Sequence, residues 1–443
     1  MKHLSLPNGS KLLAPNFIYG VATASFQIEG GVSERLPCIW DTFCSEKGKI
    51  ADGSNGDTAC DHYNRWKQDI DLISSLNVDA YRLSISWPRV ITKDGQLNPV
   101  GVKFYTDILD ELNTRGIKAF VTLYHWDLPQ HLEDEGGWLN RNTAYEFAQY
   151  VDLITQAFGN RVHSYATLNE PFCSAYLGYE IGVHAPGMVG REFGRKAAHH
   201  LLLAHGLAMQ MLAKNSPNTL NGIVLNFTPC YSVTQNDDDL AATAFADDYI
   251  NQWYLMPVIN GQYPDIIKQL SAAHRPNILP GDMEIIAQPL DYLGVNFYTR
   301  MHYQASTTDF YHELPHREPL TDIGWEIYPA ALTDLLVSLN KKYSLPPIYI
   351  TENGAAMPDV YENGEVIDED RIEYYQGHLH ALHNAVEQGV RVHGYFAWSL
   401  MDNFEWAEGY LKRFGIVHVD YESQKRTVKA SGKAYSKLIT SRK

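Results

Sequence analysis

The chain lacks the features that mark several classes of protein. It has no apolar run of the ~18 residues that a membrane-spanning helix needs, and its N-terminus carries no basic, apolar leader. It has only five cysteines, an odd number without a C-x-x-C pair, so we expect reduced cysteines rather than a disulfide framework. Its 36 basic residues are outnumbered by 52 acidic ones, and the formal charge of −16 disfavours nucleic acid and membranes as partners. We therefore expect a cytoplasmic protein with a neutral substrate.

What the 443 residues do contain is a regular alternation of short apolar segments and longer amphipathic ones. The short segments are continuous apolar runs, which is typical of parallel strands buried on both faces. The long segments have helical periodicity, and two of them end at Gly116 and Gly389. Strands are predicted at 17–22, 80–84, 119–123, 164–168, 222–225, 292–295, 348–351 and 392–397, and helices at 102–115, 144–158, 195–214, 329–342 and 371–388.

This alternation predicts an α/β fold, a single (β/α)8 TIM barrel that occupies residues 1–443 as one domain. The alternative is a doubly wound open sheet. Against it, no G-x-G-x-x-G or G-x-x-x-x-G-K-[ST] motif follows any strand, so the phosphate cradle that such sheets often carry is missing. The least patterned segment, 301–321, follows the sixth strand and is predicted to form a long loop at the barrel mouth.

The residues that follow the predicted strands are amides, carboxylates, histidine and tryptophan. In a barrel these strand ends converge on one mouth, where catalytic groups lie. This mixture suits a neutral, hydroxyl-rich ligand, because amides and carboxylates bind hydroxyl groups and aromatic rings pack on an apolar ring face. No cofactor signature accompanies it, so no cofactor is expected. The strand-end residues are Gln27, Arg82, His125, Trp126, Asn169, Glu170, Asn226, Asn296, Tyr298, Glu352 and Trp398.

Two glutamates, Glu170 and Glu352, come directly after the fourth and seventh strands. A single glutamate there is often just a helix N-terminal residue favoured by the macrodipole. Two of them facing each other across a barrel mouth provide what glycoside hydrolysis requires, one acid for the leaving oxygen and one carboxylate to attack or to activate water. Pro171 and Gly354 mark sharp turns beside them, which favours a shaped site over a plain helix start.

Four longer motifs contain these residues, and together they carry a family resemblance. From about Pro15 to Leu438 the chain resembles glycoside hydrolase family 1, the β-glucosidase family. Any one motif is weak evidence, but four in the right order make a chance match negligible. The motifs are FIYGVATASFQIEG at 17–30, TLNEP at 167–171, ITENG at 350–354, and WSLMDNFEW at 398–406 with GY at 409–410 and RFG at 413–415.

The resemblance implies a retaining β-glycosidase in which Glu170 is the acid/base and Glu352 the nucleophile. Arg82 and Tyr298 would support the nucleophile, and Trp325 would form an aromatic wall on the leaving-group side. The implied substrates are small β-glucosides or cello-oligosaccharides, cleaved at terminal β-D-glucosyl residues without metal or cofactor. The residues implied to bind the substrate are Gln27, His125, Trp126, Asn169, Asn296, Tyr298, Trp325, Trp398, Glu405 and Trp406.

Alternative functions remain open at this point. They are a β-galactosidase/β-fucosidase of broad specificity, a non-catalytic sugar-binding barrel, and a metal-dependent barrel hydrolase. The intact motifs around Glu170 and Glu352 argue against the second, and the lack of strand-end His/Asp clusters argues against the third. His378, His380 and His383 are interpreted as a solvated helix face rather than a metal site. A homo-oligomer is compatible with the sequence but not indicated by it.

Two electrostatic expectations follow from these assignments. Arg82 should hold Glu352 ionised, whereas Glu170, less compensated and near a second negative charge, should be shifted toward its neutral form.

Members of the family that bind sugar 6-phosphates have a small residue in place of Glu405 and a Tyr in place of Phe414. Free β-glucosides, rather than 6-phosphorylated ones, are therefore the expected substrates. The departures at Met357 and Ala434 from the family pattern should affect local packing only.

Overall fold

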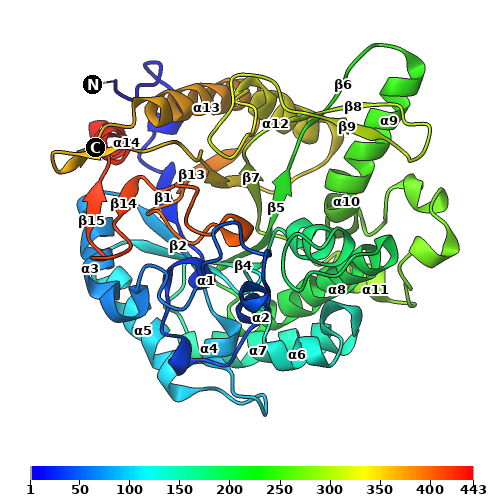
Figure 1. Cartoon of the computed structure of the whole chain (residues 1–443), viewed down its shortest axis with the longest axis horizontal. Coiled ribbons are helices and arrows are strands. Elements are labelled where there is room, and N and C mark those ends of the chain that lie inside the picture. Colours follow the sequence, from blue (N-terminus) through cyan, green and yellow to red (C-terminus); the bar gives the residue numbers. More distant parts are fainter. Residues whose placement is uncertain (1, 443) are drawn as a thin grey trace.

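The computed structural model describes residues 2–442 and contains a closed barrel of parallel strands (Figure 1). Each of the eight predicted strands is present, with ends that differ by a few residues at most. Around the barrel the order is β1-β13-β10-β7-β5-β4-β3-β2, closed by pairing of β1 with both β13 and β2. The strands are β1 (Ile18–Ala22), β2 (Ala80–Ser84), β3 (Lys118–Thr122), β4 (Ser164–Asn169), β5 (Leu220–Phe227), β7 (Tyr292–Phe297), β10 (Ile348–Asn353) and β13 (Val392–Trp398).

Helices surround this barrel (Figure 1), and their ends follow from local sequence. In α5, Pro99 occupies the first turn, the Asn98 side chain accepts from the Val100 amide, and Gly116 follows with a positive φ of 70°. The main helices are α3 (His62–Ser75), α5 (Pro99–Thr114), α7 (Asn142–Phe158), α8 (Arg191–Asn215), α9 (Asp237–Asp247), α10 (Trp253–Asn260), α12 (Ala330–Lys342), α13 (Glu369–Glu387) and α14 (Ala430–Ser441). Shorter helices are α1 (Ser25–Ile28), α2 (Ile39–Ser45), α4 (Trp87–Val90), α6 (Gln130–Asp134) and α11 (Asp282–Ile286).

Aromatic side chains fill the interior of the barrel. The Phe120 ring on β3 contacts Tyr349 on β10, across the barrel, at 5.5 Å and Phe396 on β13 at 4.9 Å between centroids. Gly20 on β1 makes room for this layer, because a Cβ there would lie 2.3 Å from the Phe396 ring. The layer closes the barrel from below, so a ligand can enter only from the C-terminal ends of the strands.

The segment 301–321 is not a plain loop, and this part of the sequence prediction is wrong. It contains β8 (Met301–Gln304) and β9 (His312–Leu314), which form a three-stranded sheet with β6 (Cys230–Ser232) outside the barrel (Figure 1). β6 lies some 70 residues earlier in the chain and pairs Tyr231 with His302. A strand that depends on so distant a partner leaves little trace in local periodicity.

The remaining strands form two small hairpins outside the barrel, β11 (Tyr361–Glu362) with β12 (Glu365–Val366) and β14 (Val417–Val419) with β15 (Arg426–Val428). All five cysteines are free, and Cys38, Cys60 and Cys173 are buried. In the part of the chain described here, no helix combines the length and the apolarity required to cross a membrane.

Candidate active site

The C-terminal ends of the strands surround a cavity of about 530 Å³, a size typical of small-molecule sites. Most of the residues expected in the site line this cavity. Gln27, Arg82 and Asn169 do not line it, but lie buried and contact residues that do. The expected residues in the lining are His125, Trp126, Glu170, Asn226, Asn296, Tyr298, Trp325, Glu352, Trp398, Glu405 and Trp406.

Glu352 is held at both carboxylate oxygens. Arg82 Nη1 donates to Oε1 at 2.5 Å, and the Tyr298 hydroxyl donates to Oε2 at 2.5 Å. Burial and the charge of Glu352 raise the pKa of Tyr298 well above its ordinary value, so the phenol remains a donor. Donors on both oxygens stabilise the ionised form and fix the orientation of the carboxylate, as a nucleophile requires.

Glu170 has a different environment. Asn296 Nδ2 donates to its Oε1 at 2.6 Å, and Cys173 Sγ lies 3.1 Å from Oε2, so both oxygens contact neutral groups. Burial and then the charge of Glu352 raise the pKa of Glu170 to about 8. Its backbone has a positive φ of 46°, which is uncommon outside glycine and occurs at functional sites. Because its pKa is about 8, the side chain of Glu170 is mainly a protonated carboxylic acid at neutral pH.

Two asparagines connect the glutamates. Arg82 Nη2 donates to Asn169 Oδ1 at 2.7 Å, and Asn296 Nδ2 donates to the same oxygen at 3.0 Å. Because Arg82 also contacts Glu352 and Asn296 also contacts Glu170, one continuous set of hydrogen bonds runs from one carboxyl group to the other. The two groups are held in fixed relative positions.

Buried polar atoms without partners point to a hydroxyl-bearing ligand. His125 Nε2 lies 3.1 Å from Asn169 Nδ2, which makes this nitrogen the acceptor and leaves the proton on Nδ1, an atom without a partner. Burial and the charge of Arg82 lower the pKa of His125 well below its ordinary value, so the ring is neutral. Gln27 donates to Asn403 and to the Phe404 carbonyl, while its Oε1 accepts from no described group. A buried donor and a buried acceptor are thus available for ligand hydroxyls.

Aromatic rings form the walls of the cavity. The Trp126 and Trp406 rings lie 4.5 Å apart, and both residues have positive φ, 77° and 49°. His125 stacks on Trp398 at 5.9 Å. Trp325 contacts Tyr298 at 5.4 Å, so its ring lies beside the side chain that donates to Glu352.

Glu405 lies in the same cavity, and its protonation state was not predicted from the sequence. Burial and then the charge of Glu352 raise its pKa to about 8, and its Oε2 lies 3.5 Å from Gln27 Nε2. At neutral pH it is mostly protonated, and it can donate to a ligand hydroxyl as well as accept from one.

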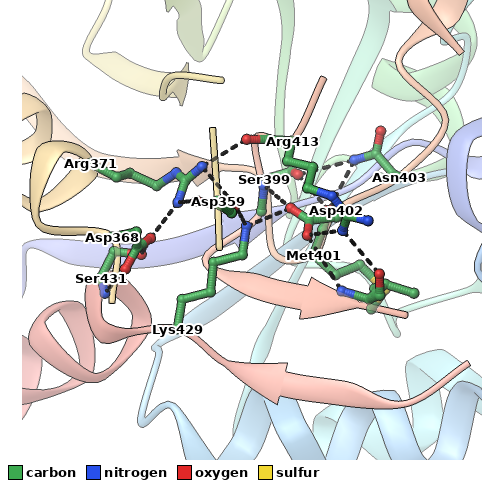
Figure 2. Close-up of polar contacts among 12 residues, drawn as sticks. Asp359, Asp368, Arg371, Ser399, Met401, Asp402, Asn403, Arg413, Lys429 and Ser431 are labelled. Atoms are coloured by element: carbon green, nitrogen blue, oxygen red, sulfur yellow. Dashed lines mark hydrogen bonds and ion pairs between the residues drawn. The ribbon is translucent and has the colours of Figure 1, made fainter. Parts of the chain in front are cut away.

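A buried cluster of paired charges supports the segment that carries Trp398, Glu405 and Trp406. Figure 2 shows Asp402 at its centre, accepting from Arg413 at 2.7 Å and from Lys429 at 2.6 Å. Lys429 also pairs with Asp359, which Arg371 contacts at 2.8 Å. Separating these partners would leave an uncompensated buried charge, which is strongly unfavourable. The cluster therefore holds the segment in place.

The structure also adds and corrects residues. Tyr176, Glu313, His316 and Glu408 line the cavity and were not expected. Tyr176 lies in the helix η4 (Cys173–Glu180), and Glu313 and His316 lie in or beside β9, two elements that sequence periodicity missed. For Glu313 and His316, the signal in the sequence was the prediction that segment 301–321 lies at the barrel mouth. The interpretation of the three histidines of α13 as a solvated face is wrong for His378, which is buried and stacked on Tyr374. Within residues 2–442 no group of three or more His, Cys, Asp or Glu is arranged to hold a metal ion.

Comparison with known proteins agrees with this geometry. The model of the family described as glycosyl hydrolase family 1 matches residues 10–443. The chain is 45% identical to a β-glucosidase of Agrobacterium sp. (strain ATCC 21400), covering 96% of this chain and 95% of that protein. It is 44% identical to a bifunctional β-D-glucosidase/β-D-fucosidase of Bifidobacterium breve, covering 96% and 97% of the two chains.

Solved structures give the same result. The AHE enzyme of Alicyclobacillus herbarius superposes with a TM-score of 0.94 at 44% identity, covering 100% of this chain and 99% of that one. A family 1 glycoside hydrolase of Thermotoga maritima, complexed with a cyclophellitol analogue described as a transition state mimic, has a TM-score of 0.94 at 42% identity and covers 97% and 98%.

Proposed function

The chain belongs to glycosyl hydrolase family 1 and acts as a β-glucosidase, and we propose that it does so by a two-step, retaining mechanism. One observation carries the proposal. The two glutamates at the mouth have opposite environments, with Glu352 held by Arg82 and Tyr298, and Glu170 buried among neutral groups. A pair of carboxyl groups separated in this way supplies a nucleophile and an acid.

In the first step, a Glu352 oxygen attacks the anomeric carbon as the bond from that carbon to the leaving oxygen breaks. The proton of Glu170 passes to the leaving oxygen, which departs as an alcohol, and a glycosyl ester of Glu352 remains. Arg82 and Tyr298 already fix the orientation of the Glu352 carboxylate, so its oxygen can form the new bond without a rearrangement of these two side chains.

In the second step, the Glu170 carboxylate accepts a proton from a water molecule, whose oxygen attacks the anomeric carbon from the opposite face. Glu352 leaves as a carboxylate, and Glu170 is again an acid. Two inversions give net retention, for which the two carboxyl groups should lie ~5–5.5 Å apart. NMR spectra of the first-formed sugar should show the β-anomer. Initial release of the α-anomer would exclude this mechanism.

We further propose that residues 1–443 act as one catalytic domain without a cofactor, on glucosides and short cello-oligosaccharides. Polar groups at the closed end, Gln27, His125 and Glu405, support a hydroxyl-rich sugar there, with Trp325 toward the leaving group. The five free cysteines favour a reducing cytoplasm as its location. Kinetics on matched β-glucosides, β-fucosides, β-galactosides and cellobiose test the sugar preference.

Activity should fall as the pH rises through about 8, because Glu170 must be protonated to act as the acid and its pKa is raised to about 8. Below that pH Glu170 is protonated and can act as the acid. The pH dependence of kcat/KM checks this. Glu405 also has a pKa raised to about 8, so Glu405→Gln is the control. The alkaline limb should persist in Glu405→Gln and disappear in Glu170→Ala, and the reverse pattern would contradict the assignment.

Sugar 6-phosphates should be poor substrates. The members that bind sugar 6-phosphates have a Lys and a Tyr at the positions of Lys412 and Phe414. Here Lys412 already donates to the Asp322 carbonyl at 2.6 Å, and Phe414 has no hydroxyl that could bind a phosphate. A dianion beside Glu405 would therefore be buried without a counter-charge, a situation that costs roughly 3–5 kcal/mol. We expect kcat/KM for a 6-phosphorylated nitrophenyl β-glucoside to be at least ~10³ lower than for the free glucoside. Comparable values would refute this, and Glu405→Ser should narrow the gap while weakening glucoside turnover.

A further inference from the structure

The cavity contains more acidic residues than the proposed reaction uses. Its lining has five glutamates but, within the described chain, neither lysine nor arginine. Three glutamates have roles already, Glu170 and Glu352 in the reaction and Glu405 at the sugar. Glu313 and Glu408 remain, and they come from different segments. Because aromatic side chains close the barrel below the site, the sugar occupies the deep end and the leaving group points to the mouth.

Glu408 is an unpaired carboxylate at this mouth. It is the last residue of the short helix η8 (Trp406–Glu408) and is only partly exposed. Its side chain makes no ion pair or hydrogen bond with any residue of 2–442. Its charge does act inside the cavity, since it is among the groups that raise the pKa of Glu405.

Glu313 lies on β9 and is exposed, with the Tyr303 hydroxyl donating to it at 3.3 Å. Beside it, His316 has a buried Nδ1 that lacks a partner among the described atoms. Burial lowers the pKa of His316, so this ring is neutral at pH 7 and does not offset the carboxylate.

The cations that form ion pairs in the neighbouring segments are engaged elsewhere, and Arg317, which follows His316, is not part of the cavity lining. Lys412 pairs with Asp322 at 3.4 Å, Arg300 with Glu326 at 2.7 Å and Arg191 with Asp309 at 3.0 Å. The rest of the mouth is largely apolar and aromatic, including Phe172 stacked on Tyr176 at 4.9 Å. Such walls lower the local dielectric and strengthen the field of the two carboxylates.

We propose that this mouth selects the leaving group by charge, accepting neutral and cationic aglycones and rejecting anionic ones through Glu313 and Glu408. The inference rests on the proposed function, because it concerns the leaving-group side of the same cavity. Like charges held close in a site of low dielectric disfavour binding, and the effect weakens as salt screens it. An ammonium group at the same position would be attracted.

The test uses three phenyl β-glucosides whose para substituent is a methylene-linked carboxylate, primary amide or ammonium group. The methylene insulates the ring, so the acidity of the leaving phenol stays nearly constant. At low salt we expect kcat/KM for the carboxylate to be about tenfold or more below that for the amide, and the ammonium compound to equal or exceed the amide. In the double variant Glu313→Gln/Glu408→Gln, and in high salt, the carboxylate-to-amide ratio should rise toward one.

Glu387→Gln is the matched control. It removes one negative charge at the last residue of α13, which leads the chain back to the start of β13, at the opposite end of the barrel from the mouth. The ratio should not change in this variant. A ratio near one in the unmodified protein, or a low ratio that the double variant leaves unchanged, overturns the inference. Failure to hydrolyse even the amide compound would instead contradict the proposed function.

Discussion

Replacing Glu352 with glycine should abolish β-glucoside turnover, lowering kcat by roughly 10⁵-fold or more, the range seen when a nucleophile is removed. The reason is that no other group is placed to form the covalent intermediate. Arg82 and Tyr298 both donate to Glu352, so the variant leaves two donors facing an empty space. Steady-state kinetics with a nitrophenyl glucoside, on protein shown to be folded by circular dichroism, measures the loss.

The same variant offers a positive control. Azide or formate fits the space left by the side chain and can attack the anomeric carbon from the face that Glu352 occupied. With a β-glucosyl fluoride and azide, the product should be the α-glucosyl azide, formed by a single inversion. Turnover above about 1% of the original without an added anion, or formation of the β-azide, would show that Glu352 is not the nucleophile.

Replacing Glu170 with alanine should produce a loss that depends on the leaving group. Proton donation by a positioned acid contributes about 10²–10⁴-fold, and only poor leaving groups need it. Cellobiose and alkyl glucosides should therefore lose that much in kcat/KM, whereas dinitrophenyl glucoside should lose little in the first step. Comparing the dependence of kcat/KM on leaving-group acidity in the two proteins measures the effect.

Glu170→Gln serves as the matched variant, because it keeps the volume and the contact with Asn296 but cannot donate a carboxylic proton. It should show the same steep dependence on leaving-group acidity. Azide should accelerate breakdown of the glycosyl ester in Glu170→Ala and give the β-glucosyl azide. An equal loss for good and poor leaving groups would assign Glu170 to substrate binding rather than to proton transfer.

Much of the fold could be predicted because parallel barrel strands have a strong local signature. All eight are short segments rich in apolar residues, and each is buried along its length apart from a few residues near the ends. The helices were similarly visible, since capping residues such as Asn98 and Gly116 lie next to the elements they end. The strands β8 and β9 were missed because β8 depends on Cys230–Ser232, a partner strand in a distant segment.

The histidines of α13 show the same limit on a smaller scale. The spacing of His378 and His380 places them on different faces, but it does not reveal which face is covered. In the structure, Phe297 of β7 and Tyr374 enclose His378, and burial lowers its pKa to about 4. His380 is exposed, and it lies 3.1 Å from the Ser5 carbonyl.

The sequence by itself determined the chemistry available to this protein. Barrel strands end in fixed order at one mouth, so the residue types after each strand, above all Glu170 and Glu352, already specified two carboxyl groups, amides and aromatic rings. Only the tertiary structure decided their states. Arg82 and Glu352 are 270 positions apart, yet they share one ion pair. Protonation depends on burial and on charges that the fold brings together, which is why the pKa of Glu405 rises alongside that of Glu170.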